Sequence, residues 1–217
     1  MYIGHYAAAA ALLAVAPETP VLPIAVAVAW PDVVWSGLVA SGVEKVRVDP
    51  SSPLQSTIRF TWYPYSHSLV LSAALTLIPA LAFGLIYQST WVGIAFWLGA
   101  VSHWLLDVPV HGKDLPILGR VGSRDGRGDR FVGWGLWSRP RLAFVAEYTF
   151  FALVALTTAP RSALVGLLAG ALLLHLLNAN SFFGFTRGNP TGTPRRYAGF
   201  ALAGFAAAIA WFTLAWQ

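Results

Sequence analysis

The sequence predicts an all-α protein, a polytopic bundle of six to seven transmembrane helices that forms one integral membrane domain over residues 1–217. Of the 217 residues, 57% are hydrophobic and only 11% are charged, whereas soluble domains average about 25% charged residues. Several apolar stretches approach or exceed the ~20 residues that a helix needs to cross a bilayer. They lack the alternation of apolar and polar residues that is typical of membrane β-barrel strands, so helices are expected.

Seven apolar segments are the expected helices. Pro17, Pro20, Pro160 and Pro194 stand at boundaries between them, where helices commonly start or stop. The first segment is short for a span, and we expect a retained helix that is tilted or re-entrant. A signal peptide would carry a basic stretch before it, and no Lys or Arg precedes it. The seven segments are 3–16, 21–42, 67–87, 90–110, 142–159, 162–180 and 197–216.

The basic residues predict the orientation of the bundle. Three polar connections, 43–66, 111–141 and 181–196, contain every Lys and Arg of the chain except Arg161. If all seven segments cross, these connections share one face with the N-terminus. Short cytoplasmic loops concentrate Lys and Arg, so the bias predicts a cytoplasmic N-terminus. The net charge of +5 is explained in the same way, with membrane lipid rather than nucleic acid as the expected partner.

Ionisable residues inside the apolar segments are the candidate functional groups, because each costs about 3 kcal/mol at the bilayer centre. His103 and Asp107 lie four residues apart, on one face of a helix, where both can bind one cation. The chain has no cysteine, so a metal must take nitrogen and oxygen ligands. The candidate metal ligands are His5, Asp32, His67, His103, Asp107 and His111.

Two alternatives compete with a metal site. The His103–Asp107 pair taken alone is more often a buried histidine bonded to a carboxylate across one helical turn. For the whole set the alternative is a proton relay or a structural hydrogen-bond network. Four of the five histidines and two acids at one depth favour a metal. Zinc is the expected ion, because its catalytic sites combine such ligands with a position for water. His175 is expected to be a structural cap.

Four short blocks of the sequence stand out: Gly4-His5, Pro31-Asp32, Ser66-His67-Ser68 and Ser102-His103-x-x-x-Asp107. Together they resemble a known family, the membrane-bound metal-dependent hydrolase-like proteins of the bacterial inner membrane. This family is considered distantly similar to zinc-dependent phospholipase C. The resemblance lies within residues 4–114, and it implies a metal site, hydrolytic chemistry and a place in the bacterial inner membrane.

The chain also departs from the pattern of that family. Val34 stands where the family has a second acid, and Trp62-Tyr63-Pro64 stands where it has His-Arg-Gly. Both changes remove metal ligands, so the resemblance supports one metal better than several. His111 and Asp114 can compensate for the loss.

The favoured function is a metal-dependent hydrolase of a phosphoester or other lipid-derived substrate near the cytoplasmic face. Asp32 or Glu147 is the candidate catalytic base, since an apolar setting raises the pKa of a carboxyl group. Guanidinium groups match phosphate in a bidentate fork, so the basic loop is expected to attract an anionic head group, although a plain solvated connector explains it equally well. The candidate substrate-binding residues are Arg120, Arg124, Arg139, Arg141 and Asp114.

Two other functions stay open at the level of sequence. A transporter or channel for protons or a metal ion would use the same intramembrane histidines and aspartates as a pathway. Transporters often have inverted repeats with sites at the membrane midplane, and no matched halves are visible here. A scaffold without enzymatic activity would leave the intramembrane acids unexplained. No oligomeric state follows from the sequence.

Overall fold

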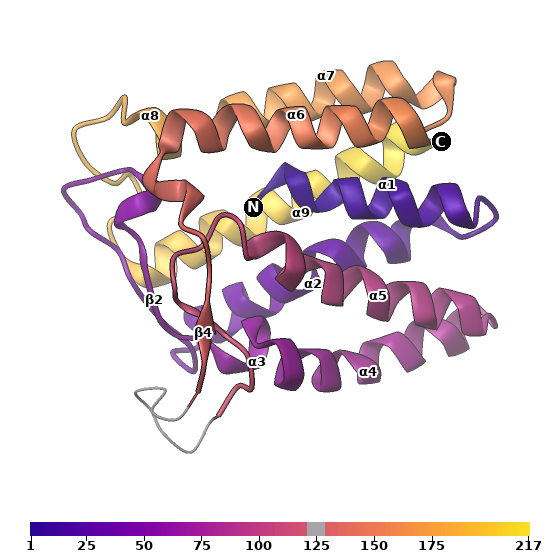
Figure 1. The fold of residues 1–217 in the computed structure, drawn as a ribbon, viewed down its shortest axis with the longest axis horizontal. Coiled ribbons are helices and arrows are strands. Elements are labelled where there is room, and N and C mark those ends of the chain that lie inside the picture. The colour runs from indigo at the N-terminus through magenta and orange to yellow at the C-terminus, as the bar shows by residue number, and fades with distance from the viewer. Residues whose placement is uncertain (121–128) are drawn as a thin grey trace.

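The protein is mostly helical, and its helices run side by side along the long axis of the molecule (Figure 1). The structure, a computed structural model, describes residues 1–120 and 129–217. Over these residues the helices are α1 (Tyr6–Val15), α2 (Val21–Ala40), α3 (Pro64–His67), α4 (Leu69–Ile86), α5 (Thr90–Asp107), α6 (Pro140–Thr158), α7 (Arg161–Leu177), α8 (Asn180–Phe183) and α9 (Pro194–Trp216).

Within residues 1–120 and 129–217, four helices are long and apolar enough to cross a membrane: α2, α4, α6 and α9. This number is smaller than the six or seven spans predicted from the sequence. α1 has 10 residues, which extend about 15 Å against a hydrocarbon core of about 30 Å. α7 stops at 17 residues. α5 is as long as α4, but His103 and Asp107 near its C-terminal end make it less apolar.

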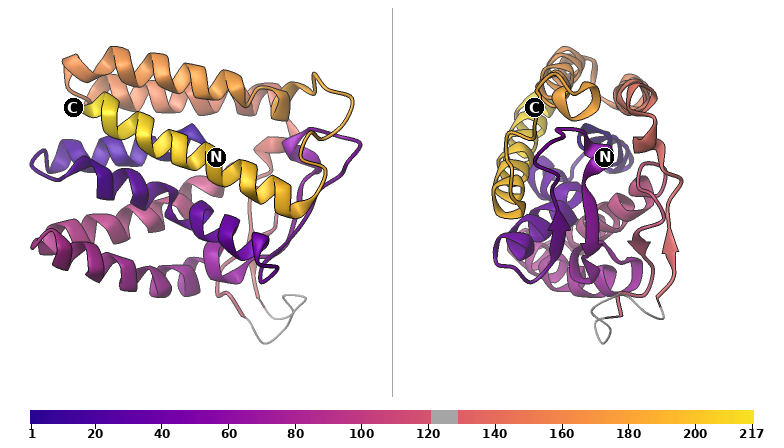
Figure 2. Two further views of the ribbon diagram at one scale, coloured as in Figure 1. Left: turned by 180° about the vertical axis from the view of Figure 1, so that it is seen from behind. Right: turned by 90° about the vertical axis from the view of Figure 1, so that its left-hand side faces the viewer.

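The short helix α1 is enclosed by other helices. Ala7, Ala9 and Ala10 are buried, and α1 packs against α2 and α6. Methyl side chains let neighbouring helix backbones approach closely. In the end view of Figure 2 the N-terminus lies among the surrounding helices. α1 is therefore shielded from the surroundings of the bundle.

The outer surface of the bundle is apolar. On α4, Ile78, Leu81 and Leu85 are each more than two thirds exposed, and Val165 on α7 is equally open. Monomeric soluble proteins rarely expose contiguous apolar patches of this kind. The surface is therefore suited to a lipid environment.

The polar connections gather at one end of the bundle, together with the short helices α3 and α8 (Figure 1). Two antiparallel hairpins lie there, and the all-α prediction did not include them. Arg161 begins α7 at the opposite end. The strands are β1 (Lys45–Arg47), which pairs with β2 (Arg59–Trp62), and β3 (Leu115–Pro116), which pairs with β4 (Phe131–Val132).

Candidate metal centre

Asp107 lies at the middle of a cluster of four histidines. Its Oδ1 is 3.2 Å from His5 Nε2. Its Oδ2 is 3.3 Å from His103 Nε2, 3.7 Å from His111 Nε2 and 3.8 Å from His67 Nε2. These residues come from four separate segments: the 3-10 turn Ile3–His5 before α1, helix α3, helix α5 and the loop after α5. Segments far apart in the sequence thus meet around one carboxylate.

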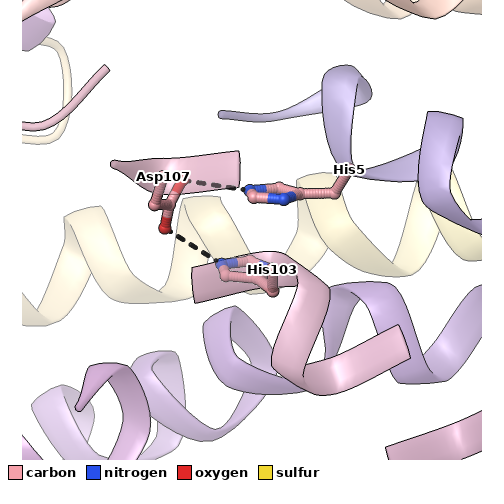
Figure 3. A group of neighbouring side chains, drawn as sticks. All are labelled: His5, His103 and Asp107. Atoms are coloured by element: carbon pink, nitrogen blue, oxygen red, sulfur yellow. Dashed lines mark ion pairs between the residues drawn. The ribbon is translucent and has the colours of Figure 1, made fainter. Parts of the chain in front are cut away.

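Asp32 of α2 joins the same cluster from the other side. Its Oδ1 is 3.3 Å from His67 Nε2, and its Oδ2 is 3.4 Å from His103 Nε2. Two sets of three residues can therefore hold a metal ion, and they share His103. Within each set the ligand atoms lie within 4.8 Å of one another. Figure 3 shows the set His5, His103 and Asp107, and the second set is Asp32, His67 and His103.

The tautomer of His103 follows from its other ring nitrogen. His103 Nδ1 lies 2.7 Å from the carbonyl oxygen of Val28, and a carbonyl can only accept, so Nδ1 donates. In the neutral ring, Nε2 then carries a lone pair. That lone pair faces the oxygens of Asp32 and Asp107, and His103 Nε2 makes no hydrogen bond.

His67 is fixed in the same way through a buried relay. Ser66 Oγ donates its proton to Glu44 Oε2 at 2.6 Å, so at 2.8 Å it accepts from His67 Nδ1. Glu44 is itself held by the backbone N–H groups of Tyr65 and Ser66. His67 Nε2 is thereby left with a lone pair that points toward Asp32.

In His111, as in His103 and His67, Nδ1 has an acceptor and Nε2 faces the aspartates. His111 Nδ1 lies 3.2 Å from the carboxylate of Asp114. Metal-binding histidines in proteins usually donate their second ring nitrogen to a carbonyl or a carboxylate, which orients the ring. Three histidines of the cluster have such partners, directly or through Ser66. Their remaining nitrogens converge on the two aspartates.

The charge balance of the cluster also fits a cation. Buried carboxylates need a compensating positive charge, and imidazole lone pairs facing them add further negative potential. The ammonium of Met1 contacts Asp107 Oδ1 at 2.5 Å. The Oδ2 side of Asp107 faces only histidines, and no Lys or Arg side chain in the described ranges forms an ion pair with Asp32 or Asp107. The residues present therefore suit a divalent metal with nitrogen and oxygen ligands.

Two local features of the sequence bring α2 and α5 together at this cluster. Pro31 has no N–H, which interrupts the hydrogen bonds inside α2 next to Val28, whose carbonyl accepts from His103. Gly99 of α5 faces Ala27 so closely that a Cβ at Gly99 would lie 2.9 Å from Ala27 Cβ. The absence of a side chain at Gly99 therefore sets the distance between His103 and Asp32.

His67 owes its position to a break in the chain. A continuous helix was expected over residues 67–87, but α3 ends at His67 and α4 begins at Leu69. Ser68 between them is extended, and its Oγ caps α4 by accepting from the N–H of Ser72. The break turns the His67 ring toward the cluster.

Glu147 of α6 supports the N-terminal segment. Its Oε1 accepts from the backbone N–H groups of Tyr2 and Gly4, the latter at 3.2 Å. The carboxylate thus fixes the turn that carries His5. Glu147 also lines the cavity described next.

A cavity of about 450 Å³ adjoins the cluster. Asp32, His67, Asp107 and His111 form its polar end, and no Lys or Arg of the described residues lines it. The rest of its wall is mainly apolar, and much of it comes from α7, α8 and α9, with further residues from the N-terminal segment, α2, α6 and the loops at the polar end of the bundle. Residues of this wall include Leu174, Leu177, Phe182, Phe200, Ala203 and Ala207.

The predicted substrate-binding residues lie away from this cavity. Arg139 and Arg141 are exposed at the start of α6. Arg120 and Asp114 line a separate cavity of about 170 Å³ beside β2. Arg124 lies outside the described residues.

His175 of α7 stands apart from the cluster. Its Nε2 donates to the carbonyl oxygen of Phe144 at 2.8 Å, and its ring stacks on the Phe144 ring. This contact joins α6 to α7 and involves no carboxylate.

Besides the Met1 ammonium on Asp107, sequence reasoning missed Glu44. It lies in a polar connection directly before Lys45, where an acid is ordinarily solvated, yet it is only 1% exposed. The one available signal was the serine before His67, whose hydroxyl needs a partner when buried. That signal does not identify the partner.

No family model matches this chain, and no curated protein or solved structure matches it either. The resemblance to the membrane-bound hydrolase-like family therefore depends on the short blocks of residues quoted above. In the part of the chain that it describes, the structure establishes a helical protein with four apolar helices of membrane length and buried His/Asp groups that can hold a metal ion.

Proposed function

We propose that this chain is an integral membrane, metal-dependent hydrolase of a phosphoester or other lipid-derived substrate, with zinc as the ion. One observation carries the proposal: His67, His103 and His111 each have Nδ1 engaged and Nε2 aimed at the carboxylates of Asp32 and Asp107. In the neutral rings these Nε2 atoms carry lone pairs, which suit a metal ion, whereas a structural hydrogen-bond network with the same geometry would need every ring to be doubly protonated.

In the membrane, we place α5 and α7 across the bilayer beside the four long helices, with α1 as a half-span. α5 tolerates His103 and Asp107 because both are buried in the bundle. The basic end, with its hairpins, faces the cytoplasm, as the bias in Lys and Arg favours. We propose that the protein is located in the bacterial inner membrane.

The cavity distinguishes the two sets of ligands. Asp32 and His67 line it, whereas His5 and His103 do not. The set Asp32, His67 and His103, with Asp107 and His111 beside it, is therefore the one that a substrate can reach. A divalent ion there would act as a Lewis acid that polarises the scissile group and acidifies a water molecule.

The two candidate bases differ in their surroundings. Asp32 faces the cavity with its two oxygens near different histidines, so one oxygen could bind the ion while the other accepts a proton from an attacking water molecule. Glu147 Oε1 is engaged by backbone N–H groups. We assign the base to Asp32 and a positioning role to Glu147.

The proposal is tested with purified protein that is stripped of metal and then assayed with and without Zn²⁺. The probes are bis(p-nitrophenyl) phosphate, a water-soluble diester, and phosphatidylglycerol vesicles. We expect zinc-dependent cleavage that Asp32→Asn lowers by about 10²–10⁴-fold, the usual contribution of a general base. Glu147→Gln keeps an acceptor oxygen and should stay near wild type. Zinc-loaded protein that cleaves neither probe would contradict the proposal.

A transporter that uses the same residues is the alternative. Its pathway would have to continue from the cluster to the opposite end of the bundle. That half is filled by a core that includes Ala10, Leu13, Ile24, Phe151 and Phe212, each at most 1% exposed. This packing favours the hydrolase, and metal flux into proteoliposomes without any hydrolysis would favour transport.

A further inference from the structure

The apolar wall of the main cavity extends away from the cluster, between α7 and α9. Leu174 and Leu177 line it from α7, and Phe200 and Ala203 line it from α9. Leu177 is 70% exposed and Phe200 is 63% exposed. Because residues that line the cavity are also open to the outside, the cavity has a lateral opening on the apolar surface of the bundle.

The opening arises from the tilt between α7 and α9. Near the opposite end of the bundle the two helices are in contact, where Trp211 Nε1 donates to the carbonyl oxygen of Gly166 at 3.0 Å and Gly166 faces Ala215. Toward the polar end the two helices separate, as Figure 1 and the left view of Figure 2 show. There α9 packs against α2 instead.

The two ends of the cavity differ in chemistry. The inner end has Asp32, His67, Asp107 and His111, and the wall between α7 and α9 has mainly leucine, phenylalanine and alanine side chains, with Asn178 and Ser181 also in the lining. A volume of about 450 Å³ falls in the ordinary range of ligand sites, about 300–1,000 Å³. A fully polar substrate would leave the lateral end without a partner, whereas an amphiphile matches both ends.

We propose that the cavity admits the alkyl chain of a membrane lipid laterally between α7 and α9, while the polar head of that lipid reaches the His/Asp cluster. This inference rests on the proposed function for the fate of the head group, but the site for the chain does not need hydrolysis. No Lys or Arg of the described residues lines the cavity, and the Met1 ammonium in its lining is already paired with Asp107 Oδ1, so an anionic head would depend mainly on the metal for its counter-charge.

The test uses photolabelling, which reports binding rather than turnover. The probe is dodecyl phosphate with a diazirine at the end of the chain, added to zinc-loaded protein in detergent and mapped by peptide mass spectrometry. We expect adducts on the C-terminal half of α7 and the N-terminal half of α9. Unlabelled dodecyl phosphate should compete for the site, and inorganic phosphate should not.

Two matched variants of α9 sharpen the test. Ala203 lines the opening and Ala206 does not, although both are exposed. Ala203→Trp should lower labelling of this site by about tenfold, because a bulky side chain fills the path of the chain, and Ala206→Trp should leave it unchanged. Circular dichroism of both variants checks that they fold.

The outcomes separate the two proposals. Labelling between α7 and α9 that Ala203→Trp abolishes supports the chain site, even if the protein hydrolyses nothing. Adducts spread over the outer face of α4, near Ile78 and Leu81, with no effect of Ala203→Trp, would overturn it, even if the metal centre is active.

Discussion

Two buried histidine sites in this protein differ in one respect. His103 and His175 are both fully buried, and each donates one ring nitrogen to a backbone carbonyl, of Val28 and of Phe144 respectively. The second nitrogen of His103 faces the carboxylates of Asp32 and Asp107. The second nitrogen of His175 makes no hydrogen bond, and aromatic rings surround it.

The comparison shows that burial and a fixed tautomer do not by themselves make a metal ligand. Around His175 the same hydrogen bond joins α6 to α7 and leaves a ring packed on Phe144, with centroids 3.9 Å apart. Around His103 the neighbouring carboxylates turn the free lone pair into part of a negative site. The carboxylates, rather than the histidines, therefore decide which buried imidazole can bind a cation.

The largest expected effect comes from exchanging the two histidines for alanine. His103→Ala should lower the affinity for Zn²⁺ by more than about 100-fold, since it removes a ligand that both sets share and even outer partners are worth about 10–100-fold. His175→Ala should keep the metal and cost about 1–3 kcal/mol of stability through lost packing. Zinc titration and thermal unfolding measure the two effects. Equal loss of zinc in both variants would contradict the distinction.

A smaller effect is expected from Glu44, which orients His67 through Ser66. Glu44→Gln weakens the acceptor for the Ser66 hydroxyl, and affinity for Zn²⁺ should fall by about 10–100-fold. Glu18→Gln is the matched control, because Glu18 is exposed in the turn between α1 and α2. Competition for Zn²⁺ against a chelator of known affinity measures the affinities of the two variants and the wild type. An unchanged affinity in Glu44→Gln would mean that the relay does not position His67.

The close packing of α5 on α2 should matter less than the ligands. Gly99→Ala places a methyl group 2.9 Å from Ala27 Cβ, and such overpacking typically costs about 1–3 kcal/mol. Gly37→Ala in α2 meets no atom within 4 Å, and it should stabilise the protein by about 0.4–1 kcal/mol. Thermal unfolding of the two variants should shift in opposite directions. Shifts of the same sign would show that Gly99 does not set the distance between the helices.

The smallest effect is expected at Asp129, an acid of the hairpin of β3 and β4 that forms no contact with either histidine site. Partial burial raises the pKa of Asp129, but the N–H groups of Leu118, Arg120, Arg130 and Gly119 outweigh burial and hold the pKa below its ordinary value. A carboxyl group with a lowered pKa stabilises the fold above its unfolded pKa and loses that contribution as pH falls through the folded pKa. The contribution should be below about 1 kcal/mol, because solvent screens this partly exposed group.

Hydrogen exchange of the Arg120 amide measures this effect. Protection should fall in acid for the wild type, and it should be low at every pH for Asp129→Ala, with zinc affinity unchanged in both. If protection of the Arg120 amide in the wild type did not change in acid, the proposed role of the Asp129 carboxylate would be contradicted.

Much of the helical framework and of the candidate ligand set followed from local properties of the sequence. The apolar stretches around residues 21–42 and 197–216 became α2 and α9, because backbone polar groups in an apolar setting must be satisfied within a helix. Asp32, His103 and Asp107 stood out because ionisable residues are costly there. These properties depend on each segment by itself.

Features that depend on packing between segments could not be predicted from the sequence. The enclosure of α1, the relay from Glu44 to His67 and the divergence of α7 from α9 each need contacts between residues far apart in the chain. The basic loop is a further example: its charge predicted substrate binding by Arg139 and Arg141, which stays a prediction, and both residues lie outside the lining of the main cavity. Composition indicates which face of the membrane a loop occupies, but not whether its side chains reach a cavity.

The most direct measurement of the central claim is zinc analysis of the purified protein combined with anomalous scattering from its crystals. The expected result is near-stoichiometric zinc, with one anomalous peak among Asp32, His67, His103 and Asp107 and none beside His175. A correctly folded protein that binds no divalent metal, or whose only peak lies away from these four residues, would contradict the claim.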